Sequence, residues 1–193
     1  SEGTITAAQA SYLTDTINAA QTAVDGPDFM DPDLGYAAHI DIPSWVDHWW
    51  INVLMMNVDA FALSDYWHKP RNGKLFAGPS WDFDRSAGSY DSRDDNPLTW
   101  NPGNNTRVFT YGWYFRFWQD PNWEQAVIDR WGELRQELVT TGNIASILHG
   151  FEADISESAV RNFAKWTSKP PNGGLAGEVT ILENWLGQRI GFI

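Results

Sequence analysis

The chain has 193 residues, of which 42% are hydrophobic and 20% are charged, a composition typical of one globular domain. Its 25 acidic and 13 basic residues give a net charge of -12. This charge argues against nucleic-acid binding, because proteins that bind the phosphate backbone of DNA or RNA usually present a basic patch. The sequence has no cysteine, which excludes disulfides and thiol catalysis, and it has no apolar run long enough to span a bilayer.

The N-terminal part of the chain predicts two helices. Apolar residues in 6–24 recur at intervals of three and four, which predicts an amphipathic helix that ends before the loop sequence DGPDFMDPDLG. Pro43 is typical of the first turn of a second helix, and the run up to about Met56 is apolar on nearly every side. We therefore expect a buried central helix there.

The hydrophobic period changes after this helix. Residues 66–69 and 74–77 form two short extended runs around the turn sequence PRNG, which predicts a β-hairpin. Residues 88–107 form a long polar loop, and loops of this length in a compact domain are usually functional or mobile.

The C-terminal half is predicted to be helical. We expect one helix over 107–118 and another that Asp120 caps, with Pro121 in its first position, running to about Leu138. One or two more helices are expected over 143–166, and a last one after the break at 169–174. The predicted fold class is mainly α with a small β-hairpin, in a single domain that covers residues 1–193.

Two acidic segments bracket the predicted hairpin. NVDAF (57–61) leaves the buried helix, and WDFD (81–84) leaves the second strand, so the hairpin is expected to bring Asp59 near Asp82. Carboxylates on loops of a rigid scaffold suit phosphoryl transfer, in which one aspartate orients the attacking hydroxyl and another holds Mg²⁺ or Mn²⁺ against nucleotide phosphates. A cation would also offset the cost of placing charge among aromatic residues.

The run from the buried helix to the end of the WDFD segment resembles the CotH family of spore-coat kinases. Members carry N-x-D, a short hairpin, then P-x-W-D-[FY]-D and a small-residue tail with glycine. The matching residues are Asn57-Val58-Asp59, Pro79-Ser80-Trp81-Asp82-Phe83-Asp84 and Gly88. DRWGELR (129–135), RNFAKW (161–166) and the final ENWLGQRIGFI resemble the family's C-terminal helices, so the likeness covers most of the chain.

The resemblance implies the C-terminal lobe of an atypical protein kinase, extracellular or at the cell surface, that uses ATP and Mg²⁺ or Mn²⁺ to phosphorylate Ser or Thr of a protein substrate. It implies that Asp59 is the catalytic proton acceptor or hydroxyl-orienting group, and that Asn57 holds the catalytic loop. Asp82 would bind the metal and nucleotide, with Asp84 as a second metal ligand or a support for the loop.

Two features depart from the family pattern. Ser64 stands where a kinase commonly has an asparagine metal ligand, and the neighbouring Asp65 is an alternative ligand. No segment before Asp59 resembles the glycine-rich loop and lysine of an N-terminal lobe. We therefore expect this lobe to be absent from residues 1–193 and to belong to further domains of a longer parent chain, without which the fragment would be inactive.

Three other interpretations remain open at the level of sequence. Asp59, Asp82 and Asp84 could anchor turns by accepting hydrogen bonds from backbone amides. Ca²⁺ could stabilise the loop, with Asp91, Asp94 and Asp95 as added oxygen ligands. The chain could also be a non-catalytic extracellular module that grips a polysaccharide through some of its 12 tryptophans and holds a structural metal, although tryptophans more often pack between helices.

Overall fold

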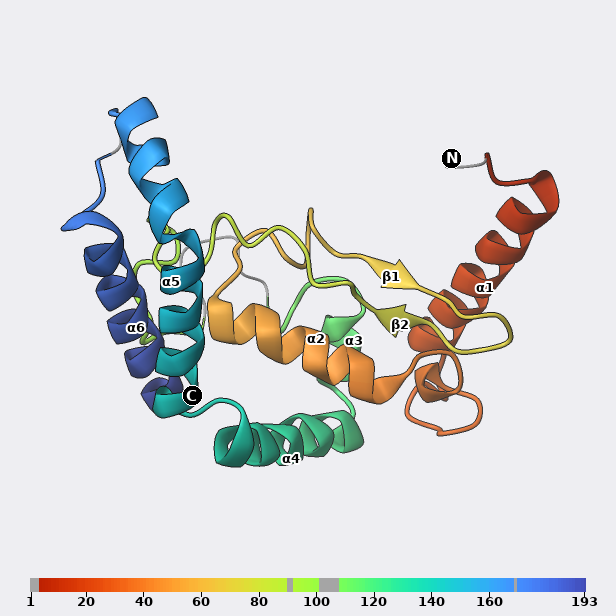
Figure 1. Cartoon of the computed structure of the whole chain (residues 1–193). Coiled ribbons are helices and arrows are strands. Elements are labelled where there is room, and N and C mark those ends of the chain that lie inside the picture. The colour runs from red at the N-terminus through yellow and green to blue at the C-terminus, as the bar shows by residue number, and fades with distance from the viewer. Residues whose placement is uncertain (1–3, 90–91, 101–107, 169) are drawn as a thin grey trace.

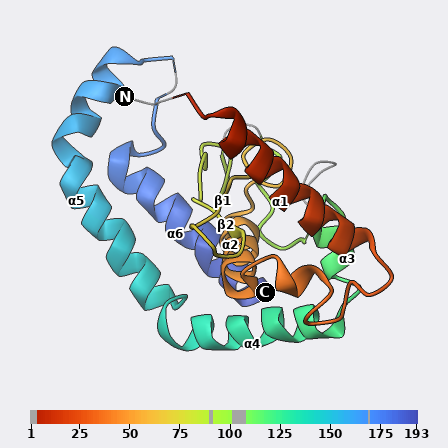
Figure 2. The same cartoon turned by 90° about the vertical axis from the view of Figure 1, so that its right-hand side faces the viewer.

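The computed structural model describes residues 4–89, 92–100, 108–168 and 170–193. The described residues form six α-helices, one 3-10 turn, η1 (Tyr36–Ala38), and one two-stranded sheet, which confirms the predicted mainly α class with a small hairpin. Helix α2 (Ile42–Met55) crosses the middle, with α1 (Ala7–Asp25) at one end and the pair α5 (Thr141–Lys165) and α6 (Gly174–Phe192) at the other (Figure 1). Figure 2 shows α1, α4 (Pro121–Glu137) and α5 around the outside, with α2 and the hairpin between them.

The first two helices begin where their capping residues stand. Thr6 forms a capping box at the start of α1, because its hydroxyl accepts from the Gln9 N–H at 3.2 Å while the Gln9 side chain accepts from the Thr6 N–H at 2.8 Å. Asp41 caps α2 by accepting from the Ser44 N–H at 3.0 Å, and Pro43 lies in the first turn. Both helices agree with their predictions.

Three tryptophans of α2 join this helix to the elements around it. Trp45, Trp49 and Trp50 are buried, and each indole N–H donates to a main-chain carbonyl. The acceptors are Leu75 at 3.1 Å, Val108 at 2.8 Å and Val127 at 2.9 Å, respectively. The rings therefore supply the buried area of the core, and their N–H groups fix α2 against the hairpin and α4 without leaving buried donors unpaired.

The hairpin is shorter than predicted. Strands β1 (Trp67–His68) and β2 (Phe76–Ala77) pair in antiparallel fashion, with Trp67 opposite Ala77. Leu75 does not extend the pairing, because its N–H donates to His39 O and its carbonyl accepts from Asp41 N. The residue before β2 is thus bonded to the segment that enters α2.

The helix predicted over 107–118 is reduced to α3 (Tyr114–Phe117) within the described residues. Gly112 has a φ of 52°, in the left-handed region, so a right-handed helix cannot continue through it. The predicted α4 is confirmed, and Asp120, its N-cap, also accepts from the Tyr36 hydroxyl at 2.7 Å. Residues 141–165 form one helix, α5, and none of the described helices has the length and apolarity needed to cross a bilayer.

Candidate functional site

The site begins at the C-terminal end of α2. Met56 adopts a left-handed conformation, with φ 51° and ψ 46°, which ends the helix and turns the chain into the segment NVDAF. The buried side chain of Asn57 then makes three hydrogen bonds. Its amide N–H groups donate to Asn52 Oδ1 and to the Asp82 carbonyl, both at 3.2 Å, and its Oδ1 accepts from the Asp59 N–H at 3.3 Å. One side chain therefore joins the loop after α2 to the loop after β2.

A second link between the two loops passes through Ser64. Its hydroxyl is buried and donates to Asp82 Oδ2 at 3.1 Å. Asp82 is exposed and has a φ of 63°, a left-handed conformation that aspartate tolerates better than most residues. The hairpin thus brings the Asn57, Asp59 and Ser64 segment beside the Asp82 segment.

The Asp59 carboxylate is paired with two arginines that sequence reasoning missed. Arg93 Nη1 lies 3.2 Å from Asp59 Oδ1, and Arg85 Nε lies 4.0 Å from Oδ2. The Asp59 side chain is 22% exposed, so it remains accessible while the two guanidinium groups offset its charge and fix its direction. The available signal was an isolated basic residue in each of the acidic runs DFDRS and DSRDD.

The other two acids suggested near the site lie apart from these contacts. Asp84 is exposed, and no hydrogen bond or ion pair joins it to another described residue. Asp65 turns toward α2, where its Oδ1 lies 3.8 Å from His48 Nε2, whereas Ser64 turns toward Asp82. Burial raises the pKa of Asp65 to about 6, partly offset by the Trp67 N–H. Asp65 therefore does not take the place of Ser64 at the site.

The described residues do not support the interpretation that Ca²⁺ stabilises this loop. Asp94 is fully buried, and its two carboxylate oxygens accept from Ser89 N at 2.8 Å and Ser89 Oγ at 3.0 Å, which makes it an anchor of the loop. Asp95 is exposed, and Asp91 lies outside the described residues. Within the described ranges, no three His, Cys, Asp or Glu side chains are grouped closely enough to hold a metal ion.

The acids at the site suit a cation that arrives with a nucleotide better than one held by protein alone. The candidate ligands are the Asp82 carboxylate and the hydroxyl of Ser64 that contacts it. Mg²⁺ commonly binds through one or two carboxylates and completes its shell with water and phosphate oxygens, whereas Ca²⁺ takes six to eight oxygens. The donor set therefore suits a divalent cation that takes its remaining oxygen ligands from water or from a bound group.

A buried arginine of α6 supports the end of α2 from behind. The Arg189 guanidinium donates to the carbonyls of Val53, Pro97 and Thr99, at 2.8, 2.9 and 2.6 Å. Burial lowers the pKa of Arg189 to about 10, so it stays charged at neutral pH. This clamp fixes the last turn of α2 to the loop that follows Arg93 and Asp94, and so supports the position of Asn57.

The tryptophans build the interior more than they build a surface platform. Seven of them are buried, and the exposed ones come from three separate places in the chain. The exposed rings are Trp67 in β1, Trp81 before Asp82 and Trp166 after α5. The packing interpretation of the high tryptophan content therefore accounts for most of these residues.

Comparison with known families gives one match. The family model described as CotH kinase protein matches residues 2–193, which includes the N-x-D segment, the hairpin and the WDFD segment. Comparison with curated proteins and with solved structures gave no match.

Proposed function

Because the chain belongs to the CotH kinase protein family, we propose that this kinase-like protein is the C-terminal lobe of an atypical kinase. In this proposal it transfers the γ-phosphoryl group of ATP to a serine or threonine of a protein substrate. It acts outside the cell or at its surface, with Mg²⁺ or Mn²⁺ as the metal.

The observation that carries this proposal is the hydrogen bonding of Asn57. Its side chain reaches the backbone of Asp59 on one side and the backbone of Asp82 on the other. Phosphoryl transfer needs an acid that orients the attacking hydroxyl and an acid that holds the metal on the phosphates, in a fixed relation to each other. A buried amide bonded to both segments provides that relation.

We assign the hydroxyl-orienting role to Asp59. Its carboxylate accepts the hydrogen bond, and then the proton, of the acceptor hydroxyl. Arg93 and Arg85 hold the carboxylate in one orientation, and in this proposal their charges also offset negative charge on the transferred phosphoryl group. Asn57 acts as a positioning residue.

We assign the metal-binding role to Asp82, with the Ser64 hydroxyl orienting its Oδ2. Asp82 would hold Mg²⁺ or Mn²⁺, and the metal would supply positive charge against the nucleotide phosphates. Asp84, which is exposed and makes no bond within the described residues, is the weaker candidate for a second ligand.

The groups that grip the far side of the nucleotide are proposed to lie outside residues 1–193. Residues 4–58 fold into α1, η1 and α2, whereas a kinase needs a glycine-rich loop and a lysine over the phosphates. The proposed active form therefore includes an N-terminal lobe carried by further domains of a longer parent chain.

The test is transfer of labelled phosphate from ATP by the parent protein that contains this chain, with the protein itself and a mixture of Ser/Thr peptides as acceptors. We expect Asp59→Asn and Asp82→Asn each to lower the rate by about 100-fold or more, because each removes a charge that acts in the transition state. Asp82→Asn keeps an oxygen for Ser64 and a residue that tolerates positive φ, so the fold is retained. Asp154→Asn on α5 is the matched control. Transfer unchanged by both active-site substitutions would remove these residues from the mechanism.

The binding-module alternative is tested separately. If the exposed tryptophans Trp67, Trp81 and Trp166 grip a polysaccharide, the chain should be retained on insoluble cellulose or xylan, and Trp81→Ala should reduce the retention. If the chain is not retained and the parent protein transfers phosphate, the binding-module alternative is rejected and the kinase proposal stands.

A further inference from the structure

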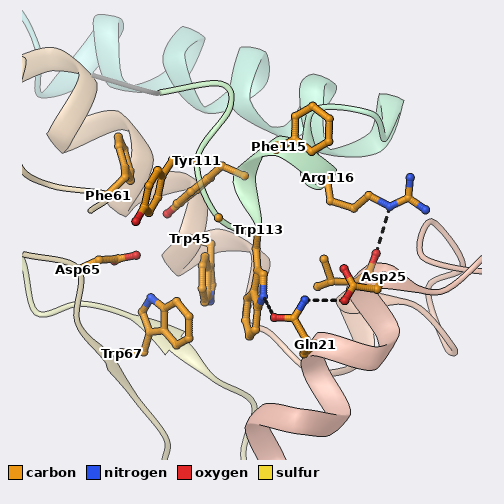
Figure 3. A pocket seen from close by; sticks show the side chains of 13 residues that line it. Gln21, Asp25, Trp45, Phe61, Asp65, Trp67, Tyr111, Trp113, Phe115 and Arg116 are labelled. Carbon is orange, nitrogen blue, oxygen red and sulfur yellow. Dashed lines mark hydrogen bonds between the residues drawn. The ribbon is translucent and has the colours of Figure 1, made fainter. Parts of the chain in front are cut away.

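A pocket of about 430 Å³ lies between α1, α2, β1 and α3, and it shares no lining residue with the Asp59 and Asp82 contacts. Its volume is within the range of small-molecule sites. Its lining includes the indole rings of Trp45, Trp67 and Trp113, which pack on one another with ring centroids 4.7 to 5.5 Å apart in each pair. Of these three rings, Trp67 is exposed and the other two are buried. Figure 3 shows these rings below Tyr111 and Phe61, with the Asp65 carboxylate pointing in from one side.

The hydrogen-bond donors of the pocket wall are used by the protein itself. The Trp45 N–H donates to Leu75 O, and the Trp113 N–H donates to Gln21 Oε1 at 2.7 Å. The Gln21 amide in turn donates to Asp25 Oδ2 at 2.8 Å, and the Trp67 N–H is directed at the Asp65 carboxylate.

The cation at the rim is also occupied. The Arg116 guanidinium lies over the Phe29 ring and donates to the carbonyls of Val24 and Gly26 and to the Gln119 side chain. It is therefore held at the α1 side of the pocket and leaves Asp65 without an arginine partner.

Asp65 supplies the charge on the pocket wall. Its Oδ1 is buried and has no hydrogen-bond partner among the described residues. His48 Nε2 lies 3.8 Å away, beyond hydrogen-bond distance. A buried carboxylate oxygen without a donor is costly, so a ligand that supplies a positive charge would be stabilised there.

We propose that this pocket binds a small alkylammonium cation, with the charge beside Asp65 and the alkyl groups against the exposed side of the Trp67 ring. Indole faces and a carboxylate both attract an organic cation, and quaternary ammonium groups are recognised by such aromatic walls. A neutral sugar would also need donors for its own oxygens, and the indole, amide and guanidinium donors named above are already used. An anion would meet two carboxylates, Asp25 and Asp65, on a protein of net charge -12.

The experiment compares choline with its neutral isostere, 3,3-dimethyl-1-butanol, by titration of the chain with tryptophan fluorescence and calorimetry as readouts. We expect choline to quench or shift the fluorescence and to bind at least about tenfold more tightly than the isostere, because only choline carries the charge. Nα-acetyl-lysine amide, titrated in parallel, distinguishes a free quaternary amine from a lysine side chain as the source of the ammonium group.

Two variants locate the binding. Asp65→Asn should weaken choline binding by about tenfold and leave the affinity for the isostere unchanged, whereas Asp154→Asn, an exposed acid on α5, should change neither. If Asp65→Asn does not fold, the comparison of choline with its isostere on the unmodified chain decides. Three results would overturn the proposal. The first is equal affinity for choline and the isostere, and the second is no binding of choline at 50 times the highest isostere concentration tested. The third is that methyl glucoside binds and choline does not.

Discussion

The core around α2 and the loop face that carries Asp59 and Asp82 are held together by different interactions. In the core, indole rings pack on one another, and the N–H groups of Trp45, Trp49 and Trp50 donate to main-chain carbonyls of other elements. On the loop face, Asn57, Ser64 and the arginines hold short irregular segments through individual polar contacts. The core is therefore stabilised mainly by buried apolar area, whereas the loop face is held in place by a few directional polar contacts.

This difference separates stability from chemistry within one small chain. Ring packing is large in energy and tolerant of small shifts, because many weak contacts contribute to it. The loop contacts are worth about 1 kcal/mol each, but they fix the direction of groups that react. Substitutions in the two regions should therefore differ in what they change.

The largest expected effect is in the core. Trp49→Ala should lower the free energy of unfolding by about 3–5 kcal/mol, because Trp49 is almost fully buried, packs against Trp50 and Trp118, and donates to Val108 O. Urea unfolding followed by circular dichroism measures the loss. Trp166→Ala, at an exposed tryptophan, is the control and should cost less than about 1 kcal/mol. Equal losses in the two variants would contradict the view that the rings of α2 carry the core.

The second prediction concerns His48, a buried titratable residue of α2. Burial lowers its pKa to about 4, so the folded protein keeps it neutral while the unfolded chain takes up a proton below about pH 6.5. Its contribution to stability is thus present above pH 6.5 and is lost between pH 6.5 and 4, by about 3 kcal/mol in total. The groups that face it are Asp65, Tyr114 and Asn52. The raised pKa of Asp65, about 6, acts in the opposite direction, since a carboxyl with a raised pKa gains stability as the pH falls.

The two contributions offset each other in the unmodified chain, and the His48→Gln variant separates them. Relative to the unmodified chain, this variant should gain about 3 kcal/mol between pH 7 and pH 4, as measured by urea unfolding at several pH values. His149→Gln is the control with the opposite sign. The Glu152 hydrogen bond raises the pKa of the exposed His149, so its contribution is present at low pH and is lost as the pH rises. A His48→Gln difference that does not depend on pH would show that His48 is not held neutral.

The same comparison explains what the sequence could predict. The first helix followed from periodicity, the second from Pro43 and its apolar run, and α4 from its cap, since Asp120 acts within three residues of its own position. The proximity of the N-x-D and WDFD segments followed from a hairpin between them. The pairing of Arg93 and Arg85 with Asp59, the turn of Asp65 toward His48 and the anchoring role of Asp94 depend on where loops settle in three dimensions, which no local pattern fixes. The helix predicted over 107–118 is shortened to α3, because Gly112 adopts a left-handed conformation that no neighbouring residue predicts.

The smallest expected change in stability is on the loop face, and it should be local. Asn57→Ala removes hydrogen bonds to Asn52, Asp59 and the Asp82 carbonyl, and leaves the buried Asn52 Oδ1 and two part-buried backbone groups without these partners. We expect a loss of about 1–3 kcal/mol in the free energy of unfolding. Asn57→Asp keeps the acceptor for the Asp59 N–H but removes both donors, so it separates the link to Asp82 from the link to Asp59. Asn184→Ala, at an exposed asparagine of α6, is the control.

Amide hydrogen exchange is the measurement that tells a local effect from a global one. If Asn57 joins two loops and does little else, exchange should rise in peptides covering 57–65 and 81–89 and stay unchanged in α2 and α4, because local opening needs less free energy than global unfolding. In the Asn57→Asp variant the rise should be confined to 81–89, since the bond to the Asp59 N–H remains. A uniform rise over all peptides would mean that Asn57 supports the core as the tryptophans do, and the distinction between the two regions would fail at the residue that joins them.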